Sequence, residues 1–204
     1  MTTFTPTTRR QALARLLAAG SIVACPAIAA AADAKATDKK EPDDKTYDQG
    51  TITHDVTEFF GSTTEGLAKV IEKAFAENGR PTGYIKGEEA SAAVTVGIRY
   101  GNGTLTLKGG GSRKVYWTGP SIGFDAGANA SKVFILVYHL PTAEDIFKRY
   151  GGVDGSLYYI GGAGINYQRR GSVVLAPIRL GVGLRAGASV GYMSYSKTKT
   201  WIPL

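Results

Sequence analysis

The stretch that decides the fold runs from residue 181 to residue 192 and reads GVGLRAGASVGY. Small or polar residues alternate in it with apolar ones, so Gly183 and Arg185 fall on one face of an extended chain and Leu184 and Ala186 on the other. A period of two predicts a β-strand, because successive side chains point to opposite faces. Glycine weakens a strand and occurs where a sheet bends sharply or another group approaches the backbone closely. The pattern predicts small, strongly curved β-structure with a polar side chain held on a glycine surface.

Two other segments carry the same alternation, residues 121–130 with Asp125 at the centre and the looser copy at residues 162–170 with Asn166. If these strands come together in a small barrel, the side chains of Asp125, Asn166 and Arg185 converge. Such a trio predicts either an internal ion pair that fixes strand register or a group of ligand-binding residues. The sequence leaves both interpretations open.

Turn signals recur at short, regular intervals through the rest of the chain, which favours an all-β barrel or sandwich of about nine strands. Turns are predicted at residues 101–103 and 119–120, and the apolar run at residues 133–137 predicts a strand buried on both faces. Two short helices are predicted in addition. Their signals are the capping box at residues 62–65, followed by apolar residues at helical spacing, and the cap at Thr142. The predicted fold class is mainly β with two short helices (α+β), a small closed or nearly closed antiparallel β-barrel.

The N-terminal residues 1–32 have the composition of an export signal, with basic residues ahead of an apolar run that ends in small residues. A lipobox-like string ends at Cys25, so lipidation of Cys25 is the alternative to plain cleavage. Residues 33–47 are charged and poor in apolar mass, which predicts a disordered linker. Residues 48–204 are predicted to form a single β-barrel domain of an exported protein.

Charge and catalytic residue types exclude several function classes. The chain has 24 basic and 17 acidic residues, a net charge of +7. Removal of the signal takes away three arginines and leaves +4, too mild an excess to predict a nucleic-acid partner. The only cysteine lies in the signal, and one of the two histidines, His54, has just Asp55 and Glu58 nearby. We therefore expect no metal, no cofactor and no enzymatic activity.

Aromatic residues supply a second candidate feature. Tyr116, Trp117 and Tyr167 are of the types that suit boundaries between water and apolar surface. Beside basic residues such as Arg169 they predict contact with a phospholipid or glycolipid headgroup. Ordinary core filling by strand residues is the competing interpretation.

Several unusual strings occur in order along the chain: YWTGPSIGFDAG at residues 116–127, NYQR at 166–169, APIR at 176–179 and GVGLR at 181–185. With them the chain resembles the envelope integrity protein A family of alphaproteobacteria, over about residues 47–204. The resemblance implies an exported periplasmic β-barrel that supports cell-envelope integrity, with no catalytic residues to carry over. The glycine-rich region is more distantly similar to the SYLF lipid-binding domain, which implies an amphiphile as ligand.

The leading hypothesis is a non-enzymatic exported protein that maintains the envelope by binding a lipid or other envelope component. The expected partner is a lipid or an envelope glycan, in peripheral association with the envelope. Its ligand-binding candidates are the residues already introduced, namely Asp125, Asn166, Arg185, Tyr116, Trp117, Tyr167 and Arg169. One alternative is an outer-membrane transmembrane β-barrel, whose strands also alternate in polarity. Another is an envelope glycan hydrolase using acids such as Asp125, Asp145 and Asp154.

Overall fold

The computed structural model describes residues 45–62, 64–125, 131–181 and 191–200, except for the side chains of residues 92–96 and 121–125. These described residues all belong to one compact unit that begins at Lys40. The predicted export signal, Cys25, most of the predicted linker and Arg185 lie outside the described residues, as does the side chain of Asp125.

Two helices open the described part of the chain, α1 (Gln49–Phe60) and α2 (Glu65–Asn78). The hydroxyl of Thr64 accepts a hydrogen bond from the Leu67 backbone N–H at 3.1 Å, so Thr64 and not Ser62 caps α2. Helix α2 ends as predicted, since Gly79 follows it with φ +73°. Helix α1 was not predicted, because it buries only Ile52 and Val56 and its threonines weaken the helical signal.

The second predicted helix is much shorter than expected. Only a four-residue 3₁₀ turn, η1 (Ala143–Ile146), forms after Thr142. Strand β4 (Arg149–Gly152) begins three residues later, because Tyr150 pairs with Met193 of strand β9 (Tyr192–Ser196). The described residues do form two α-helices, as predicted, but these are α1 and α2, and the helix predicted after Thr142 is only the turn η1.

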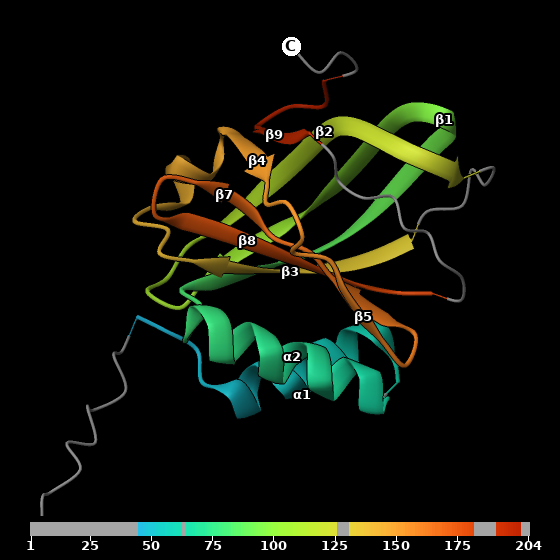
Figure 1. The fold of residues 1–204 in the computed structure, drawn as a ribbon. Helices are drawn as coiled ribbons and strands as arrows, with labels where there is room; N and C mark the ends of the chain where they lie inside the picture. The colour runs from blue at the N-terminus through green and yellow to red at the C-terminus, as the bar shows by residue number, and fades with distance from the viewer. Residues whose placement is uncertain (1–44, 63, 126–130, 182–190, 201–204) are drawn as a thin grey trace, which may run out of the picture. The chain divides into compact units, whose positions relative to one another are not determined.

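Strand β1 (Gly83–Leu107) is long and doubles back on itself, as the curved ribbon in Figure 1 shows. A Cβ added to Gly103 would lie 2.6 Å from the Lys86 carbonyl oxygen and 3.0 Å from the Gly87 Cα, so the two arms of β1 run side by side. The predicted turn at residues 101–103 is thus wrong, since these residues lie within the second arm. The second arm pairs with β2 (Ser112–Asp125).

The turn predicted at Gly119 and Pro120 is wrong as well, because both residues lie inside β2, where Pro120 pairs with Ile98. Proline is tolerated here because the other neighbour, β9, pairs only with residues 116–118 of β2. Gly119 is needed because a Cβ at this position would lie 2.4 Å from the Tyr192 carbonyl oxygen.

The remaining strands complete one antiparallel sheet that closes into a barrel. They are β3 (Ser131–Tyr138), β5 (Tyr158–Ile160), β6 (Ala163–Ile165), β7 (Gln168–Arg170) and β8 (Val173–Leu180). The order β3-β1-β2-β9-β4-β7-β8 becomes a ring because β3 also pairs with β8, for example Val133 with Arg179. With both arms of β1 counted, the described ring has eight strands, which confirms the predicted closed barrel. Strand β7 pairs with residues 173–175 of β8. The hairpin of β5 and β6 pairs with β8 farther along, through β6 and residues 178–180.

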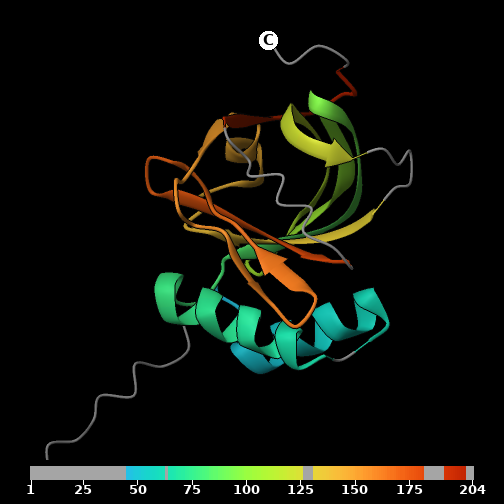
Figure 2. The ribbon, with the colours of Figure 1, turned by 45° about the vertical axis from the view of Figure 1, so that its right-hand side comes forward.

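Strand β3 separates two apolar cores, which confirms its predicted burial on both faces. Its side chains Val133, Ile135 and Val137 join the barrel interior, whereas Phe134 and Leu136 pack on the helix layer with β6 and β8. Figures 1 and 2 show α1 and α2 lying side by side across this wall. A transmembrane barrel has a polar interior and an apolar outer band. The described barrel instead has an apolar interior around Ile135, and the outer face of its β3 wall is covered by α1 and α2, so the structure contradicts the transmembrane alternative.

Candidate functional site

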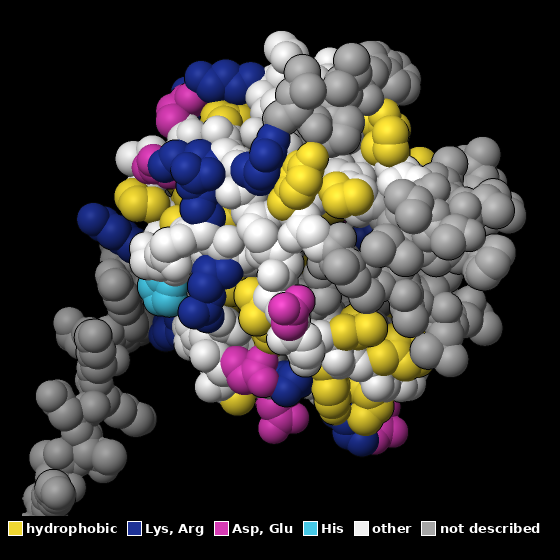
Figure 3. Space-filling view, turned by 45° about the horizontal axis from the view of Figure 1, so that its top comes forward, with side chains coloured by type: hydrophobic (Ala, Val, Ile, Leu, Met, Phe, Trp, Pro, Cys, Tyr) yellow, Lys and Arg dark blue, Asp and Glu magenta, His cyan; other side chains and the backbone are white. Residues whose placement is uncertain are grey.

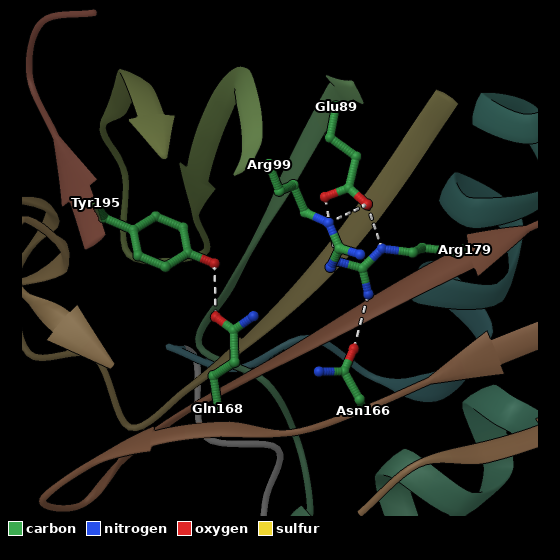
Figure 4. A network of polar contacts seen from close by, with 6 residues as sticks. All are labelled: Glu89, Arg99, Asn166, Gln168, Arg179 and Tyr195. Carbon is green, nitrogen blue, oxygen red and sulfur yellow. Dashed lines mark hydrogen bonds and ion pairs between the residues drawn. The ribbon is translucent and has the colours of Figure 1, made fainter. Parts of the chain in front are cut away.

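The barrel interior changes from apolar to charged toward one end, where a cluster of buried ionic side chains lies. Glu89 and Arg99 come from the two arms of β1, and Arg179 comes from β8 (Figure 4). Glu89 and Arg99 are 6% and 8% exposed, whereas Arg179 is half-buried. These residues reach the interior through strand alternation, since Glu89 and Ile85 share a face of β1 and Arg179 is paired with the inward-facing Val133.

Glu89 is the centre of this ionic cluster. Its carboxylate accepts hydrogen bonds from Nε and Nη2 of Arg179, the second at 3.1 Å, and lies 3.8 Å from Nε of Arg99. Nη1 of Arg179 also donates to the side-chain oxygen of Asn166 at 2.7 Å. A bidentate carboxylate–guanidinium contact fixes both groups in orientation.

The charges of the ionic cluster determine its protonation. Burial by itself would raise the pKa of Glu89, but the positive charges of Arg179 and Arg99 outweigh it and hold the pKa below its usual range. Hydrogen bonds from Arg179 and Trp117 act in the same direction. Glu89 is therefore ionised at neutral pH, and the three charged groups of the cluster sum to one positive charge.

A neighbouring polar pair lies deeper in the interior. The hydroxyl of Tyr195 donates to the side-chain oxygen of Gln168 at 3.0 Å, and Gln168 is 1% exposed. Burial raises the pKa of Tyr195, so its hydroxyl stays protonated and remains a donor. Figure 4 shows this pair beside the ionic cluster.

The glycines of β1 make room for Trp117. A Cβ on Gly101 would lie 2.0 Å from the Trp117 ring, and a Cβ on Gly87 would lie 2.8 Å from it. Glycine here lets a side chain pack directly on the backbone, the role that the sequence predicted for the glycines of residues 121–130, 162–170 and 181–192. The approaching group is the protein's own indole, which is 2% exposed.

A cleft of about 320 Å³ opens beside Trp117. The lining residues combine aromatic and polar side chains from both arms of β1, from β2 and from the segment after β9: Glu88, Glu89, Ala90, Tyr100, Gly101, Asn102, Tyr116, Trp117, Ser196, Lys199 and Thr200. Tyr116 pairs with Asn102 across the strands and with Ser196 on its other side, so these three side chains share one face of the sheet. The cleft shares Glu89 and Trp117 with the interior, which connects it to the ionic cluster.

The predicted site residues that the structure describes fall into separate places. Tyr116 and Trp117 line the cleft, and Asn166 joins the ionic cluster through Arg179. Tyr167 is 8% exposed and packs in the helix-facing core, where burial raises its pKa. Arg169 is exposed on β7, opposite Gly151. The convergence predicted for Asp125, Asn166 and Arg185 falls largely outside the described residues, so ligand binding by these residues stays a prediction.

Sequence reasoning missed the residues that form the core of the ionic cluster, Glu89, Arg99 and Arg179. A usable signal was present, because Glu89 continues the period-two series that begins at the buried Ile85. A charge in phase with buried apolar positions indicates either an exposed strand end or an internal ion pair.

One group of possible metal-ligating side chains lies on α1, where the ligand atoms of His54, Asp55 and Glu58 are within 4.8 Å of one another. His54 and Glu58 are exposed, and Asp55 accepts a hydrogen bond from Lys86 Nζ at 2.9 Å. Exposed acidic groups often lie this close without a metal, so we assign none. Among the described residues, none of the helices is both long and apolar enough to span a membrane.

These features define a class: a small closed antiparallel β-barrel with an apolar interior, a two-helix layer on one wall and an ionic cluster that adjoins a surface cleft. The family model of envelope integrity protein A matches residues 45–204, and the chain belongs to this family. The predicted resemblance is confirmed, and membership indicates an envelope-associated role in cell-envelope integrity.

A crystal structure of a β-barrel-like, uncharacterized protein from Brucella abortus is similar to this chain. The two are 45% identical with a TM-score of 0.72, over 78% of this chain and 99% of that chain. A comparison with curated proteins gave no match.

Proposed function

We propose that this chain is a non-enzymatic protein of the periplasm that supports envelope integrity by binding the saccharide part of an envelope glycan or glycolipid. The observation that carries the proposal is the cleft beside Trp117, with its lining of tyrosine, glutamate and asparagine. Aromatic rings pack on the apolar faces of sugar rings, while carboxylate and amide groups bond to hydroxyls. Family membership supports the envelope as the source of the ligand.

The size of the cleft favours a headgroup over an acyl chain. A volume of about 320 Å³ is at the small end of the range for ligand pockets. The described barrel interior around Ile135 is filled by the protein's own apolar side chains. A lipid would therefore be recognised by its polar end.

The ionic cluster supports a binding role for the cleft. Arg179 donates two hydrogen bonds to Glu89, which fixes the Glu89 side chain before any ligand arrives. A preorganised surface loses less entropy on binding. An ionised Glu89 held by two arginines is also a poor general acid at neutral pH, which favours binding over acid-catalysed hydrolysis.

The test uses the intrinsic fluorescence of Trp117, isolated by Trp201→Phe because Trp201 is the other tryptophan of the chain. The two soluble probes are the peptidoglycan disaccharide and the delipidated core oligosaccharide of lipopolysaccharide. We expect at least one probe to shift the fluorescence, and we expect Tyr116→Ala to weaken that binding about tenfold through loss of ring contact. Tyr159→Ala is the matched control, because Tyr159 is 47% exposed on β5 and does not line the cleft.

Failure of both probes to bind would contradict the saccharide proposal. Equal losses in the two tyrosine variants would contradict the role of the cleft. Mass spectrometry of the recovered probe checks the non-enzymatic part, because hydrolysis of the disaccharide by the wild-type chain would overturn it.

A further inference from the structure

We propose that a basic face of the barrel, none of whose basic side chains lines the cleft, docks this protein on an anionic lipid surface. The face is formed by the start of β2, the residues between η1 and β4, β4 and β7 themselves, and the segment after β9. Its basic side chains are all exposed, and they are Arg113, Lys148, Arg149, Arg169, Arg170 and Lys197. Figure 3 shows Lys and Arg side chains gathered on one part of the surface.

Direct contacts make these side chains one continuous face. Nη1 of Arg170 donates to the Arg149 carbonyl oxygen at 3.2 Å, which joins β7 to β4. Arg113 and Lys197 lie 3.3 Å and 2.6 Å from the carboxylate of Glu144, which joins the ends of β2 and β9 through η1. The face is therefore built from four separate parts of the chain, so no single charged run in the sequence predicts it.

The basic face keeps a large charge excess after its internal pairs are counted. Glu144 pairs with Arg113 and Lys197, and Asp145 pairs with Lys148 at 2.9 Å. Six basic side chains against Glu144, Asp145 and the exposed Asp154 next to Val153 leave three positive charges on this face. The helices α1 and α2 show the opposite balance, with five acidic and two basic residues. The molecule is thus electrostatically two-sided, and one side suits an anionic partner.

Apolar and aromatic groups beside the arginines favour a lipid surface over a soluble anion. Arg149 stacks on the Tyr192 ring at 4.3 Å, and Lys197 lies 5.3 Å from the Phe147 ring. Val153 directly follows β4, is 39% exposed, and its backbone N–H donates to Tyr167, two residues before Arg169. An exposed valine and partly exposed aromatic rings next to basic side chains match the boundary between headgroups and acyl chains.

This inference is independent of the saccharide proposal, and its test contains no glycan. The full chain is sedimented with vesicles of pure phosphatidylcholine and with vesicles that contain phosphatidylglycerol as one lipid in three. We expect binding to the anionic vesicles alone, and we expect added salt to weaken it, because surface charges are screened within about 10 Å at 0.1 M. Equal binding to both vesicle types would overturn the proposal.

A triple variant, Arg149→Gln with Arg169→Gln and Arg170→Gln, tests the face itself. We expect more than about a tenfold loss of vesicle binding, since each basic side chain near an anionic surface contributes several-fold. The control removes three bases elsewhere, by Lys69→Gln, Lys73→Gln and Arg80→Gln, and should bind vesicles within about twofold of wild type. Unchanged thermal unfolding shows that both variants are folded. An equal loss in the two variants would overturn the proposal, as would wild-type binding to soluble polyphosphate but not to anionic vesicles.

Discussion

The barrel interior is apolar around Ile135 and charged around Glu89. Ile135 is 1% exposed, and its burial contributes stability in proportion to the area removed from water. Glu89 is buried to a similar degree, but the cost of removing its carboxylate from water is offset only while Arg99 and Arg179 are in place. Similar burial therefore has different consequences. The apolar part can lose a methyl group and remain partly packed, whereas removal of one charged side chain leaves its partners buried without a counter-charge.

The largest effect is expected from neutralising the acid of the charged part. Glu89→Gln leaves Arg99 and Arg179 in the interior without their carboxylate, and removing one partner of a buried ion pair costs about 3 to 5 kcal/mol. Urea denaturation measures the free energy of unfolding. The exposed neighbour Glu88→Gln should stay within about 0.5 kcal/mol of wild type. Equal stability of the two variants would remove the contrast between the two parts of the interior.

In the apolar part, Ile135→Ala should reduce the free energy of unfolding by about 3 kcal/mol, because it removes buried methyl groups and leaves a cavity. Ile135→Val removes one methylene and should cost about 1 kcal/mol. Thermal or urea unfolding gives both values. Ile98→Ala is the control, since Ile98 is 37% exposed and its loss should be well below that of Ile135. A loss at Ile98 as large as that at Ile135 would mean that the interior is not the source of stability.

A pH series distinguishes the two parts of the interior, because Glu89 changes its charge in the acid range and the apolar side chains around Ile135 do not. The pKa of Glu89 is lower in the folded chain than its unfolded value of 4.5. The stabilisation from its ionised form is therefore fully present above about pH 4.5 and is lost as the pH falls through the folded pKa. We expect the stability difference between wild type and Glu89→Gln to be constant from pH 6 to 7.5 and to shrink below about pH 4.5. A difference that instead shrinks as the pH rises would assign the stabilisation to another group.

A smaller effect than at Glu89 is expected at the neighbouring polar pair of Tyr195 and Gln168. Tyr195→Phe removes the donor to Gln168 and leaves a buried amide oxygen without that bond, which costs about 1 to 2 kcal/mol. Tyr159→Phe removes an exposed 3.3 Å bond to the Gly181 carbonyl oxygen and should cost less than about 0.5 kcal/mol. Differential scanning calorimetry resolves the two. Similar small losses would show that water replaces the bond to Gln168.

The sequence predicted those features that repeat along the chain. The run at residues 133–137 is apolar at every position, so burial on both faces could be predicted without knowing its neighbours. Helix α2 was predictable because its apolar stripe spans several turns, and only its cap was placed two residues early. The glycines at 101 and 103 were read as a turn, because glycine serves turns and close packing equally well.

The candidate site could be predicted only in part, because it depends on pairs that are far apart in the chain. Tyr116 and Trp117 were found through their residue type, and Asn166 through its glycine-rich surroundings. The partnership of Glu89 with Arg179 joins residues 90 positions apart, and nothing local to either residue specifies the other. That pairing follows from the register of β3 with β1 and with β8.

The position of β9 has a consequence for how the chain reaches its final form. This strand lies between β2 and β4, and it pairs Ser196 with Tyr116. A nascent chain that still lacks residues 192–196 therefore leaves two sheet edges with unsatisfied backbone groups, which can pair with other chains. Closure of the barrel has to wait until residues 192–196 have been synthesised, long after strands β1 and β2 of the same sheet.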